Sequence, residues 1–458
     1  MAARNALGRH LALVGFMGAG KSTLGPAVAE RLGREFASVD AIVEERAGAL
    51  VADVFETRGD AAFRTLEEEA ALDVLSRRPP AVVELGGGAL GSDRTRGALN
   101  EHAFTVHLET TADEAWERVA ASGRPLARDP VAFRQLYDAR RPLYEAADAT
   151  AGDLDGVVLA ATGIRFAPHG EARGDAVVAD VTVAELHGID ATHSVPPGEA
   201  AKTVAEADRL WRALSIDRSS TLVAIGGGST TDLAGFVAAT YMRGIDWVAV
   251  PSTLVGQVDA AIGGKVGVDL AGGKNVVGAF HWPAETIVDV TLLDTLPDEE
   301  RRNGLAEVVK TGLLAGESLW ELGTEEQVRR CAAFKAAVCL RDPYERGDRT
   351  KLNLGHTFAH ALEAASGFTV RHGHAVALGL LAALRLSGLE DEARGVEEVL
   401  APALVELDRD AAWDALQRDK KAVDGRIRLV LLDAPGKARV TSEIEPERVR
   451  AALDSLIA

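Results

Sequence analysis

Apolar and polar positions alternate in two different ways over the first third of the chain. Short apolar runs predict β-strands, and stretches with an apolar residue every three or four positions predict α-helices. Their alternation predicts an α/β domain with a parallel sheet. The expected strands are HLALVGF (10–16), AVVELGGG (81–88) and FTVHLE (104–109), and the expected helices are STLGPAVAERLG (22–33) and AAFRTLEEEAALDVLS (61–76).

A second α/β pattern follows a weakly periodic segment at 150–176, whose richness in Gly, Ala and Asp predicts a junction. From about Leu293 the pattern is mostly helical. We therefore predict a parallel α/β/α domain at 1–162, a junction at 163–175 and a second domain at 176–458, divided into a Rossmann-like α/β part (176–292) and a mostly α part (293–458). The expected strands of the second domain are DAVVADV (175–181), TLVAIGGG (221–228), WVAVPST (247–253) and TIVDV (286–290).

Composition and charge limit the partners. The 458 residues exceed what one hydrophobic core serves. A net charge of -19 argues against nucleic acid and anionic lipid as partners, although a local Lys/Arg cluster still permits small anions. No apolar run reaches the roughly 20 residues of a membrane span. The first residues show no signal-peptide pattern and the two cysteines have no CxxC spacing, so we expect a cytoplasmic protein.

Residues 15–22, GFMGAGKS, match G-x-x-x-x-G-K-[ST] between an expected strand and an expected helix, which is the context of a phosphate-binding loop. The glycines allow backbone N–H groups to face phosphate oxygens at the positive end of the helix. We expect Lys21 to reach the β- and γ-phosphates of ATP and Ser22 to ligate Mg²⁺. The residues expected to bind ATP are Gly15, Gly18, Ala19, Gly20, Lys21, Ser22 and Thr23.

This loop alone does not separate a kinase from a GTPase, but no guanine-reading N-K-x-D follows and the domain is too short for a large ATPase. Later loops carry Asp40, which can accept a hydroxyl proton, and arginines that can pair with carboxylates or phosphates. Over residues 11–162 the text GFMGAGKST, VDAIVE, VFETRGDAAFRTLE, GGG, GRPL and RxPLY resembles shikimate kinase. The resemblance implies a P-loop kinase fold and ATP-dependent phosphorylation of the 3-hydroxyl of shikimate.

The resemblance also implies roles for single residues. Asp40 would bind the shikimate hydroxyls near the nucleophile, and Arg124 would be a lid residue that reaches the transferring phosphate. Arg118 would stack on adenine. The residues implied to bind shikimate are Asp40, Arg64, Gly86, Gly87, Gly88 and Arg140.

One departure from the family concerns Mg²⁺. The family usually has D-x-D where this chain reads Ser38-Val39-Asp40, so the carboxylate that supports the Mg²⁺ water shell is missing. Glu84 stands just before the glycine triplet, at a position that is commonly small and polar. We hypothesise that Glu84 replaces the lost carboxylate from the neighbouring strand end. The alternative is a nucleotide-binding regulatory module whose kinase activity has decayed.

A second nucleotide signal begins at residues 225–228, IGGG, which end an expected strand and precede a helix start at Asp232. Such a turn brings the backbone close to a pyrophosphate, although the pattern is not G-x-G-x-x-G. Asp180 follows another expected strand, at a place suited to a ribose hydroxyl. Glu199 and Lys202 lie in the loop PPGEAAK.

Histidines and basic residues then indicate a metal and an anionic substrate. His356 and His360 are spaced i,i+4, and this spacing alone predicts them as joint metal ligands. His372 and His374 follow in RHGHAV. A metal with three protein ligands and an open position would polarise a hydroxyl or carbonyl of the substrate. The basic residues beside Gly and Asn motifs are Arg243, Lys265, Lys274, Lys310, Arg349, Lys420 and Lys421.

From about residue 175 the chain resembles 3-dehydroquinate synthase. The matching text is GEAAK, GGGSTTDLAGFVAATYMRG, PSTLVGQVDAAIGGK, GGKNVVGAFHWP, TLPDEERRNGLAEVVK, NLGHTFAHALE, HGHAV and DKK. The resemblance implies conversion of 3-deoxy-arabino-heptulosonate 7-phosphate to 3-dehydroquinate and phosphate. NAD⁺ would be used catalytically, because transient oxidation acidifies the neighbouring C–H and the hydride later returns.

By motif position, the resemblance implies Glu307, His356 and His372 as the ligands of Zn²⁺ or Co²⁺, which overrules the spacing argument and leaves His360 as a proton-handling residue. Lys265, Lys310 and Arg349 would act in catalysis. The implied NAD⁺ site is Asp180, Glu199, Lys202, Gly227, Gly228, Asp232 and Thr253. The implied substrate site is Arg243, Asp259, Lys265, Lys274, Asn275, Lys310, Lys335, Arg349, Asn353 and Lys420.

Departures exist here too. His374 stands where the family commonly has Glu, and it would add a competing metal ligand or face outward. Asp269 replaces a usual Asn and Trp282 a usual Gln. The strands before Asp175 are abbreviated.

We expect a homodimer through the second half, with Arg243 contacting phosphate across its interface. The alternative class is a metal-dependent polyol dehydrogenase, which the many cations disfavour because a neutral polyol needs no phosphate clamp.

Overall fold

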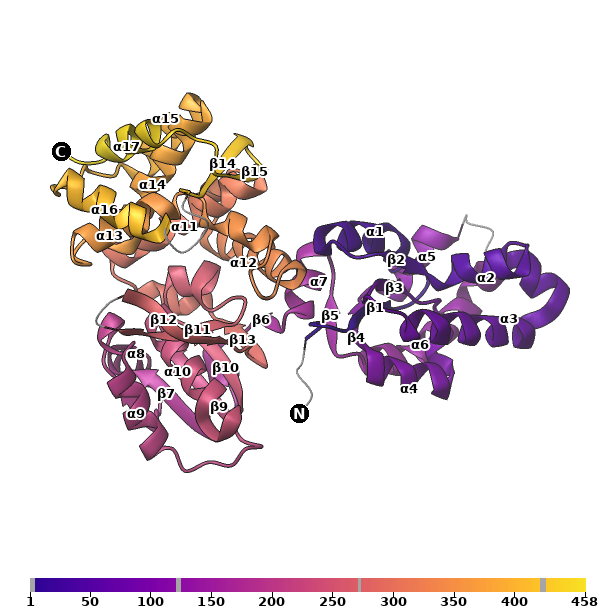
Figure 1. Ribbon diagram of the computed structural model, residues 1–458. Coiled ribbons are helices and arrows are strands. Elements are labelled where there is room, and N and C mark those ends of the chain that lie inside the picture. Colours follow the sequence, from indigo (N-terminus) through magenta and orange to yellow (C-terminus); the bar gives the residue numbers. More distant parts are fainter. Residues whose placement is uncertain (1–4, 121–124, 271–272, 421–425) are drawn as a thin grey trace. The chain divides into compact units, whose positions relative to one another are not determined.

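The protein is described by a computed structural model that covers residues 5–120, 125–270, 273–420 and 426–458 (Figure 1). The chain divides into two compact units, Met1–Arg165 and Phe166–Ala458. Within the described ranges, no helix is long and apolar enough to span a membrane. The first unit has one sheet, and the second unit has one large sheet and two two-stranded sheets within the described residues.

A five-stranded parallel sheet forms the centre of the first unit, in the order β2-β3-β1-β4-β5. Every residue of the central strand β1 is buried, which accounts for the apolar run that follows His10 in this strand. The three predicted strands are confirmed as β1, β3 and β4, whereas β2 and β5 are too short to show a pattern. The strands are β1 (His10–Val14), β2 (Phe36–Ser38), β3 (Val82–Glu84), β4 (Ala103–Leu108) and β5 (Ala149–Ala151).

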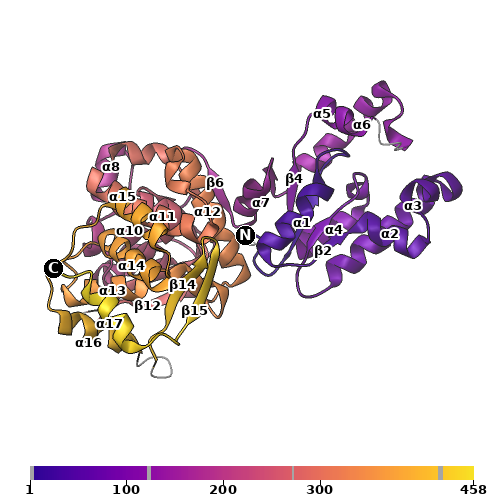
Figure 2. The same ribbon diagram turned by 90° about the horizontal axis from the view of Figure 1, so that it is seen from above.

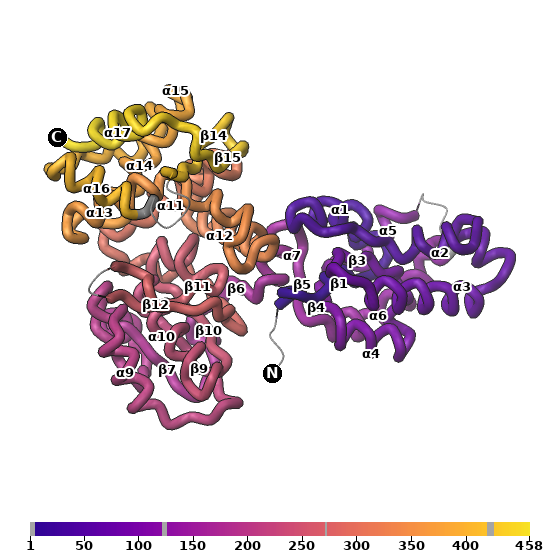
Figure 3. The backbone as a smooth tube through the Cα atoms, in the orientation of Figure 1, coloured from indigo at the N-terminus to yellow at the C-terminus, as the bar shows by residue number. Residues whose placement is uncertain are grey.

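Helices cover both faces of this sheet, with α1 and α7 on one side and α4 on the other (Figure 1). The long helix α3 bends at Gly59, whose φ is 81°. The tube in Figure 3 follows the chain from β1 through the phosphate-binding loop into α1. The helices are α1 (Lys21–Leu32), α2 (Val39–Ala47), α3 (Val51–Ser76), α4 (Asp93–His102), α5 (Ala112–Val119), α6 (Pro130–Glu145) and α7 (Leu154–Ala161).

The second unit begins with a six-stranded sheet in the order β6-β13-β10-β9-β7-β8. The four predicted strands are confirmed as β7, β9, β10 and β13, while β6, from the segment predicted as a junction, forms one edge. Strands β8, β7, β9, β10 and β13 are parallel, so their carboxyl ends share one edge. The strands are β6 (Ile164–Phe166), β7 (Ala176–Asp180), β8 (His193–Val195), β9 (Thr221–Gly226), β10 (Asp246–Pro251) and β13 (Glu285–Val288).

An antiparallel hairpin, which the sequence did not predict, runs between the sheet and the helical part of this unit (Figures 1 and 3). Its strands are β11 (Lys265–Leu270) and β12 (Gly273–Phe280). The helices that accompany the sheet are α8 (Val181–His187), α9 (Val204–Ala213) and α10 (Gly228–Thr240).

The rest of the second unit is mostly helical, as predicted, with α14 at its centre. Nearly every residue of α14 from Gly373 to Leu384 is buried, because this helix is apolar on all sides. Figure 2 shows the additional hairpin of β14 (Leu429–Ala434) and β15 (Lys437–Thr441). The helices are α11 (Asp298–Ala315), α12 (Thr324–Arg341), α13 (His356–Ala365), α14 (His372–Ser387), α15 (Glu390–Leu400), α16 (Arg409–Lys420) and α17 (Pro446–Asp454).

Candidate active sites

The phosphate-binding loop of the first unit leads from β1 to α1. Gly18 and Gly20 adopt φ values of 85° and 88°, which favour glycine. The loop is closed by Lys21, whose Nζ donates to the carbonyl oxygens of Gly15 at 2.7 Å and Phe16 at 3.0 Å. Arg118 lies beside it and donates from Nη1 to Gly18 O at 2.9 Å. The backbone and one ammonium thus form an anion-binding cradle.

Ser22, in the first turn of α1, forms a hydrogen bond with Glu84, at the end of β3. The Ser22 hydroxyl donates to Glu84 Oε1 at 2.5 Å, and Glu84 is the buried last residue of β3. Ser38 is the register partner of Glu84 on β2. Its hydroxyl accepts from the backbone N–H of Ala41 at 3.4 Å and caps α2. The hydroxyl that this type of loop offers to Mg²⁺ is therefore in contact with a carboxylate.

A cavity of 530 Å³ lies between α3, the glycine triplet and α6. Arg64 pairs with Glu67 at 2.5 Å, and Arg140 donates from Nη1 to Gly87 O at 3.1 Å. A β-carbon at Gly88 would lie 2.2 Å from Arg64 Nη1, so only glycine allows this approach. Both arginines face the cavity and can hold a carboxylate bidentately.

Two carboxylates complete this pocket. A β-carbon at Gly86 would lie 2.2 Å from Glu67 Oε1 and 2.9 Å from Asp40 Oδ1, so Asp40 joins the same region. Burial raises the pKa of Glu67, against the opposing charge of Arg64. The sequence prediction overlooked Glu67, although its i,i+3 spacing from Arg64 on a helix was a usable signal. Arg124, predicted as the lid residue, lies outside the described residues.

The predicted nucleotide site of the second unit gathers where β9 gives way to α10. A β-carbon at Gly227 would lie 3.0 Å from Thr253 Cγ2. Lys202 pairs with Asp232 at 2.5 Å, and burial raises the pKa of Asp232 against that ammonium charge. Asp180 lies at the carboxyl end of β7 and caps α8 by accepting from Thr182 N at 2.8 Å. This edge combines a narrow glycine turn, a helix N-terminus and polar groups, as a pyrophosphate site requires.

Two further residues of the predicted nucleotide site, Glu199 and Gly228, lie at the N-terminus of α10. Glu199 accepts from the Ser229 hydroxyl at 3.1 Å, at the start of α10. Gly228 is the first residue of that helix, and a β-carbon there would lie 3.0 Å from Ala260 Cβ. A side chain at Gly227 or at Gly228 would fill the space in front of the N-terminus of α10.

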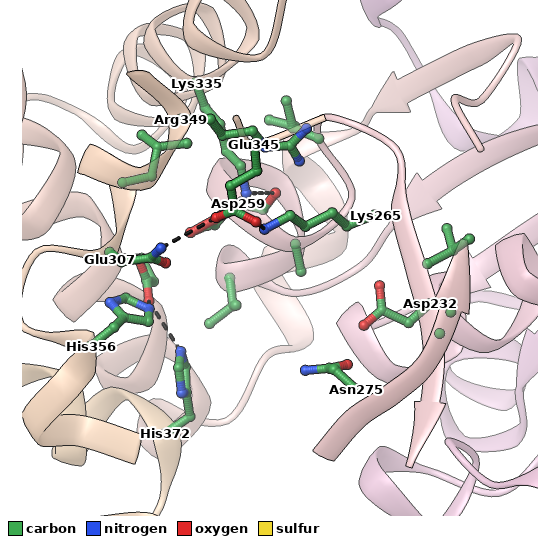
Figure 4. Close-up of a pocket in the computed structure, with 18 of the residues that line it drawn as sticks. Asp232, Asp259, Lys265, Asn275, Glu307, Lys335, Glu345, Arg349, His356 and His372 are labelled. Atoms are coloured by element: carbon green, nitrogen blue, oxygen red, sulfur yellow. Dashed lines mark hydrogen bonds and ion pairs between the residues drawn. The ribbon is translucent and has the colours of Figure 1, made fainter. Parts of the chain in front are cut away.

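Glu307, His356 and His372 form a cluster whose potential ligand atoms all lie within 4.8 Å of one another (Figure 4). Glu307 Oε1 lies 3.1 Å from His372 Nε2 and 3.6 Å from His356 Nε2. The three residues come from three helices, namely α11 for Glu307, α13 for His356 and α14 for His372. One carboxylate and two imidazoles are a donor set suited to a catalytic Zn²⁺ or Co²⁺ with an open position.

Charges around the cluster shift its pKa values. Burial opposes ionisation of Glu307, but Lys310 and the two imidazoles hold the pKa of Glu307 well below its usual range. Burial lowers the pKa of His356. Burial also disfavours charged His372, yet hydrogen bonds to Glu307 and Glu363 raise the pKa of His372 to about 9. Glu363 lies 3.4 Å from His372 Nδ1, as a carboxylate that orients a ligand imidazole would.

The cluster faces a cavity of 580 Å³ whose wall carries paired charges (Figure 4). Lys310 Nζ lies 2.9 Å from Asp259 Oδ2, and Lys335 donates to Asp259 O at 2.8 Å. Burial lowers the pKa of Lys335 to about 8, although the charges of Asp232 and Glu345 oppose this shift. The Lys335 ammonium also forms an ion pair with Asp259. Lys265 pairs with Glu345.

Most of the predicted substrate residues line this one cavity, and one acidic residue joins them. Glu345 was not predicted, although its place four residues before Arg349 in a charged loop was a signal. It also accepts from Asn353 Nδ2 at 3.3 Å. The predicted residues that line the cavity are Asp232, Asp259, Lys265, Asn275, Glu307, Lys310, Lys335, Arg349, Asn353, His356, His360 and His372.

Other predicted residues lie elsewhere or are not described. Lys274 lies 3.9 Å from Glu199 and 3.8 Å from Glu363, beside the cavity. Arg243 lies in a short turn with a φ of 67° and is not among the lining residues. The Lys420 side chain lies outside the described part of the chain.

The two remaining histidines are outside the ligand cluster. The His360 ring lies 5.5 Å from the His356 ring, measured between centroids, and lines the cavity. His374 Nε2 lies 2.7 Å from Ala403 O, so this ring is engaged by the backbone. Of the two possibilities raised for His374, the structure favours the one in which it is not a ligand.

The two architectures are therefore a P-loop α/β/α domain and a Rossmann-like sheet joined to a helical metal-binding part. Residues 17–156 match the shikimate kinase family, residues 192–303 the N-terminal part of 3-dehydroquinate synthase, and residues 304–422 its C-terminal part. The chain belongs to the 3-dehydroquinate synthase family and carries a shikimate kinase domain before it.

Individual relatives and solved structures are similar to parts of this chain. The 3-dehydroquinate synthase of Symbiobacterium thermophilum is 39% identical over 364 residues, which are 70% of this chain and 99% of that protein. The structure of 2-epi-5-epi-valiolone synthase from Streptomyces hygroscopicus, with NAD⁺ and Zn²⁺ bound, is 26% identical with a TM-score of 0.55 and covers 64% of this chain and 95% of that one. Shikimate kinase from Acinetobacter baumannii, in complex with shikimate, is 36% identical over 31% of this chain and 82% of that one, with a TM-score of 0.30.

Proposed function

We propose that the chain is a bifunctional enzyme. Its first domain phosphorylates shikimate with ATP to give shikimate 3-phosphate. Its second part converts 3-deoxy-arabino-heptulosonate 7-phosphate to 3-dehydroquinate and phosphate. The observation that carries the proposal is the Glu307, His356 and His372 cluster facing a wall of lysines and arginine, because a phosphorylated acid needs both.

In the first domain, the loop N–H groups and Lys21 would hold the nucleotide phosphates, with Mg²⁺ near Ser22. Arg64 and Arg140 would bind the shikimate carboxylate and so fix the ring. Asp40 would accept the proton of the attacking hydroxyl at its carboxylate oxygen. Phosphoryl transfer depends mainly on such positioning and charge stabilisation.

In the second part, Glu307, His356 and His372 would hold Zn²⁺ or Co²⁺, which would supply Lewis acidity at a substrate hydroxyl. The turn at Gly227 and Gly228, with Asp232, would hold NAD⁺, which would supply reversible hydride-transfer chemistry. The support for these cofactors is the donor set, the glycine turn at Gly227, and related synthases whose structures hold NAD⁺ with Zn²⁺ or with Co²⁺. Lys265, Lys310 and Arg349 would bind the anionic groups of the substrate. His360 would hold or move a proton at the ring nitrogen nearest the cavity.

The carboxylates of Glu345 and Asp259 would hold the cavity lysines until anionic groups of the substrate replace them as ion-pair partners. Lys265 is paired with Glu345, and Lys310 with Asp259, so these side chains bring no large excess of positive charge to the cavity. An incoming carboxylate or phosphate would share or displace these partners. Such pairing holds the ammonium groups in position before the substrate arrives.

The purified full-length chain, assayed for both reactions with and without a tight chelator, tests the proposal. We expect the chelator to abolish phosphate release from the heptulosonate phosphate, and added Zn²⁺ or Co²⁺ to restore it. With excess Mg²⁺ present, shikimate-dependent ADP release should continue. Accumulation of NADH would instead indicate a dehydrogenase, and absence of shikimate-dependent ADP release would indicate a regulatory nucleotide-binding domain.

We further propose a homodimer through the second half, in which Arg243 reaches the partner's substrate phosphate. Its position away from the cavity lining of its own chain supports this. Light scattering should give twice the mass of one chain. Mixing Arg243→Ala with an inactive His356→Ala variant should restore part of the activity, because one mixed site would contain both intact residues.

A further inference from the structure

We propose that Glu84 is the carboxylate that supports Mg²⁺ in the kinase domain, held by β3 rather than by β2. The inference rests on the proposed kinase function and specifies how its metal is held. Three independent features carry it: the contact with Ser22, the burial of the carboxylate and the strand register.

The contact places Glu84 beside the metal-binding hydroxyl. In P-loop proteins, Mg²⁺ is held by the loop Ser or Thr together with a carboxylate from a nearby strand end. Ser22 is that hydroxyl, and it donates to Glu84 Oε1 at 2.5 Å. Strand β3 is the direct neighbour of β1, which carries the loop. A cation bound at Ser22 would therefore meet Glu84, directly or through one water.

Burial explains why a cation is the natural partner. The Glu84 side chain belongs to a residue only 9% exposed. A buried carboxylate is costly without an opposite charge. Among the described residues, no Lys or Arg forms an ion pair with Glu84, and its side-chain hydrogen bond comes from a neutral hydroxyl. A divalent cation would supply the missing charge.

The register shows where an equivalent carboxylate could stand. Ser38 and Glu84 are partners on the parallel strands β2 and β3, so their side chains point to the same face of the sheet. The Ser38 hydroxyl already caps α2. An Asp at position 38 would face the same space as Glu84. At this register pair a carboxylate can come from either strand: from Glu84 on β3, as in this chain, or from an Asp introduced at position 38 on β2.

The test measures ADP binding by calorimetry to the full-length chain, in Mg²⁺ and in EDTA, without shikimate. For wild type we expect Mg²⁺ to strengthen ADP binding. Glu84→Gln keeps a hydrogen-bond acceptor for Ser22 but removes the charge. We expect it to reduce the Mg²⁺ enhancement by about 10-fold or more, with unchanged binding in EDTA. Adding Ser38→Asp to Glu84→Gln should recover the enhancement.

Asp73→Asn is the matched control, because Asp73 is a surface carboxylate paired with Arg46 and Arg77, and it should leave the enhancement unchanged. An unchanged enhancement in Glu84→Gln would overturn the inference. So would equal weakening in Mg²⁺ and EDTA, which would make Glu84 a residue that only positions the loop. Because the readout contains no shikimate, a chain that binds Mg²⁺ and ADP through Glu84 but fails to phosphorylate shikimate would refute the kinase function alone.

Discussion

The two candidate sites of this chain would bind phosphate through different kinds of groups. The first site presents mainly backbone N–H groups, with one lysine fixed by two carbonyls of its own loop. The second site presents side-chain cations, each held against a buried or half-buried carboxylate. In the first case glycine conformation and close approach determine the site, whereas in the second case the balance of charges does. Substitutions should therefore damage the two sites through different physical causes.

Removing a metal ligand should give the largest effect. His356→Ala takes one of three ligand atoms from the cluster. Since loss of a residue that only orients a ligand costs about 10- to 100-fold, loss of the ligand itself should lower synthase activity by more than about 100-fold. Shikimate-dependent ADP release from the same chain should not change. Elemental analysis and both assays would measure this.

His374→Ala is the control for that experiment. The His374 ring is hydrogen-bonded to Ala403 O and lies outside the cluster. Metal content and synthase activity of the variant should therefore remain within about two-fold of wild type. Metal loss in His374→Ala equal to that in His356→Ala would contradict the ligand assignment.

Breaking the buried charge balance should give the next largest effect. Lys310 is 3% exposed and lies against Asp259 and Glu307. Lys310→Met leaves both carboxylates without this ammonium, and should lower the free energy of unfolding of the second unit by about 3 kcal/mol. Urea unfolding of the metal-free protein, followed by the fluorescence of its tryptophans, would measure the change.

Lys351→Met provides the comparison, because Lys351 pairs with half-exposed Asp348 at 2.8 Å. Screening by solvent limits this pair to less than about 1 kcal/mol. Equal costs for the two lysines would show that charge burial does not govern the second site.

A steric change should affect the first site more moderately. Gly88→Ala would place a β-carbon 2.2 Å from Arg64 Nη1 and push the guanidinium away. We expect KM for shikimate to rise by about 10-fold, with little change in ADP affinity, because one charge-assisted contact of about 1.5 kcal/mol is weakened. Gly97→Ala in α4 meets nothing within 4 Å and should leave KM unchanged. A rise in ADP dissociation constant as large as the rise in KM would argue against a local effect.

The smallest effect concerns pH and the stability of the first unit. Fully buried His10 accepts from the backbone N–H of Ala81 at Nδ1, 3.0 Å, and donates from Nε2 to Arg77 O, 3.1 Å. This arrangement needs the neutral ring, and burial lowers the pKa of His10 below 6.5. Neutral His10 therefore stabilises the fold above about pH 6.5, and this stability is lost as pH falls through the folded-state pKa.

We expect the melting temperature of the first unit to fall by a few degrees between pH 7 and pH 5. In His10→Asn, whose Oδ1 can replace Nδ1 as acceptor without titrating, the fall should be smaller. The same slope in both proteins would assign the pH dependence to other groups.

Sequence patterns predicted the elements whose residues interact locally. The strand, glycine loop and helix of the first site follow one another along the chain, so their geometry is encoded within about 20 residues. Partners that meet only through packing were missed. Glu345 reaches Lys265 across 80 positions, and the short strands β2 and β5 gain their conformation from neighbouring strands.

The ligand set shows the same limit. Spacing along α13 predicted His356 with His360, because i,i+4 places both on one helix face. The cluster instead joins His356 to residues of α11 and α14. Helix packing decides which imidazole faces Glu307, and no spacing rule contains that information. The resemblance to a family supplied the set that residue spacing alone did not.

The central position of α14 has a kinetic consequence for the metal. His372 is the first residue of this buried helix, and Gly379 approaches Gly355 of the α13 start so closely that a β-carbon would lie 2.2 Å from Gly355 O. Two of the proposed ligands, His356 and His372, thus belong to helices that cannot separate without opening the core. We expect metal exchange to be slow, with a half-time in chelator that follows amide hydrogen exchange in α14. The ion would then serve as a long-lived cross-link of the helical core.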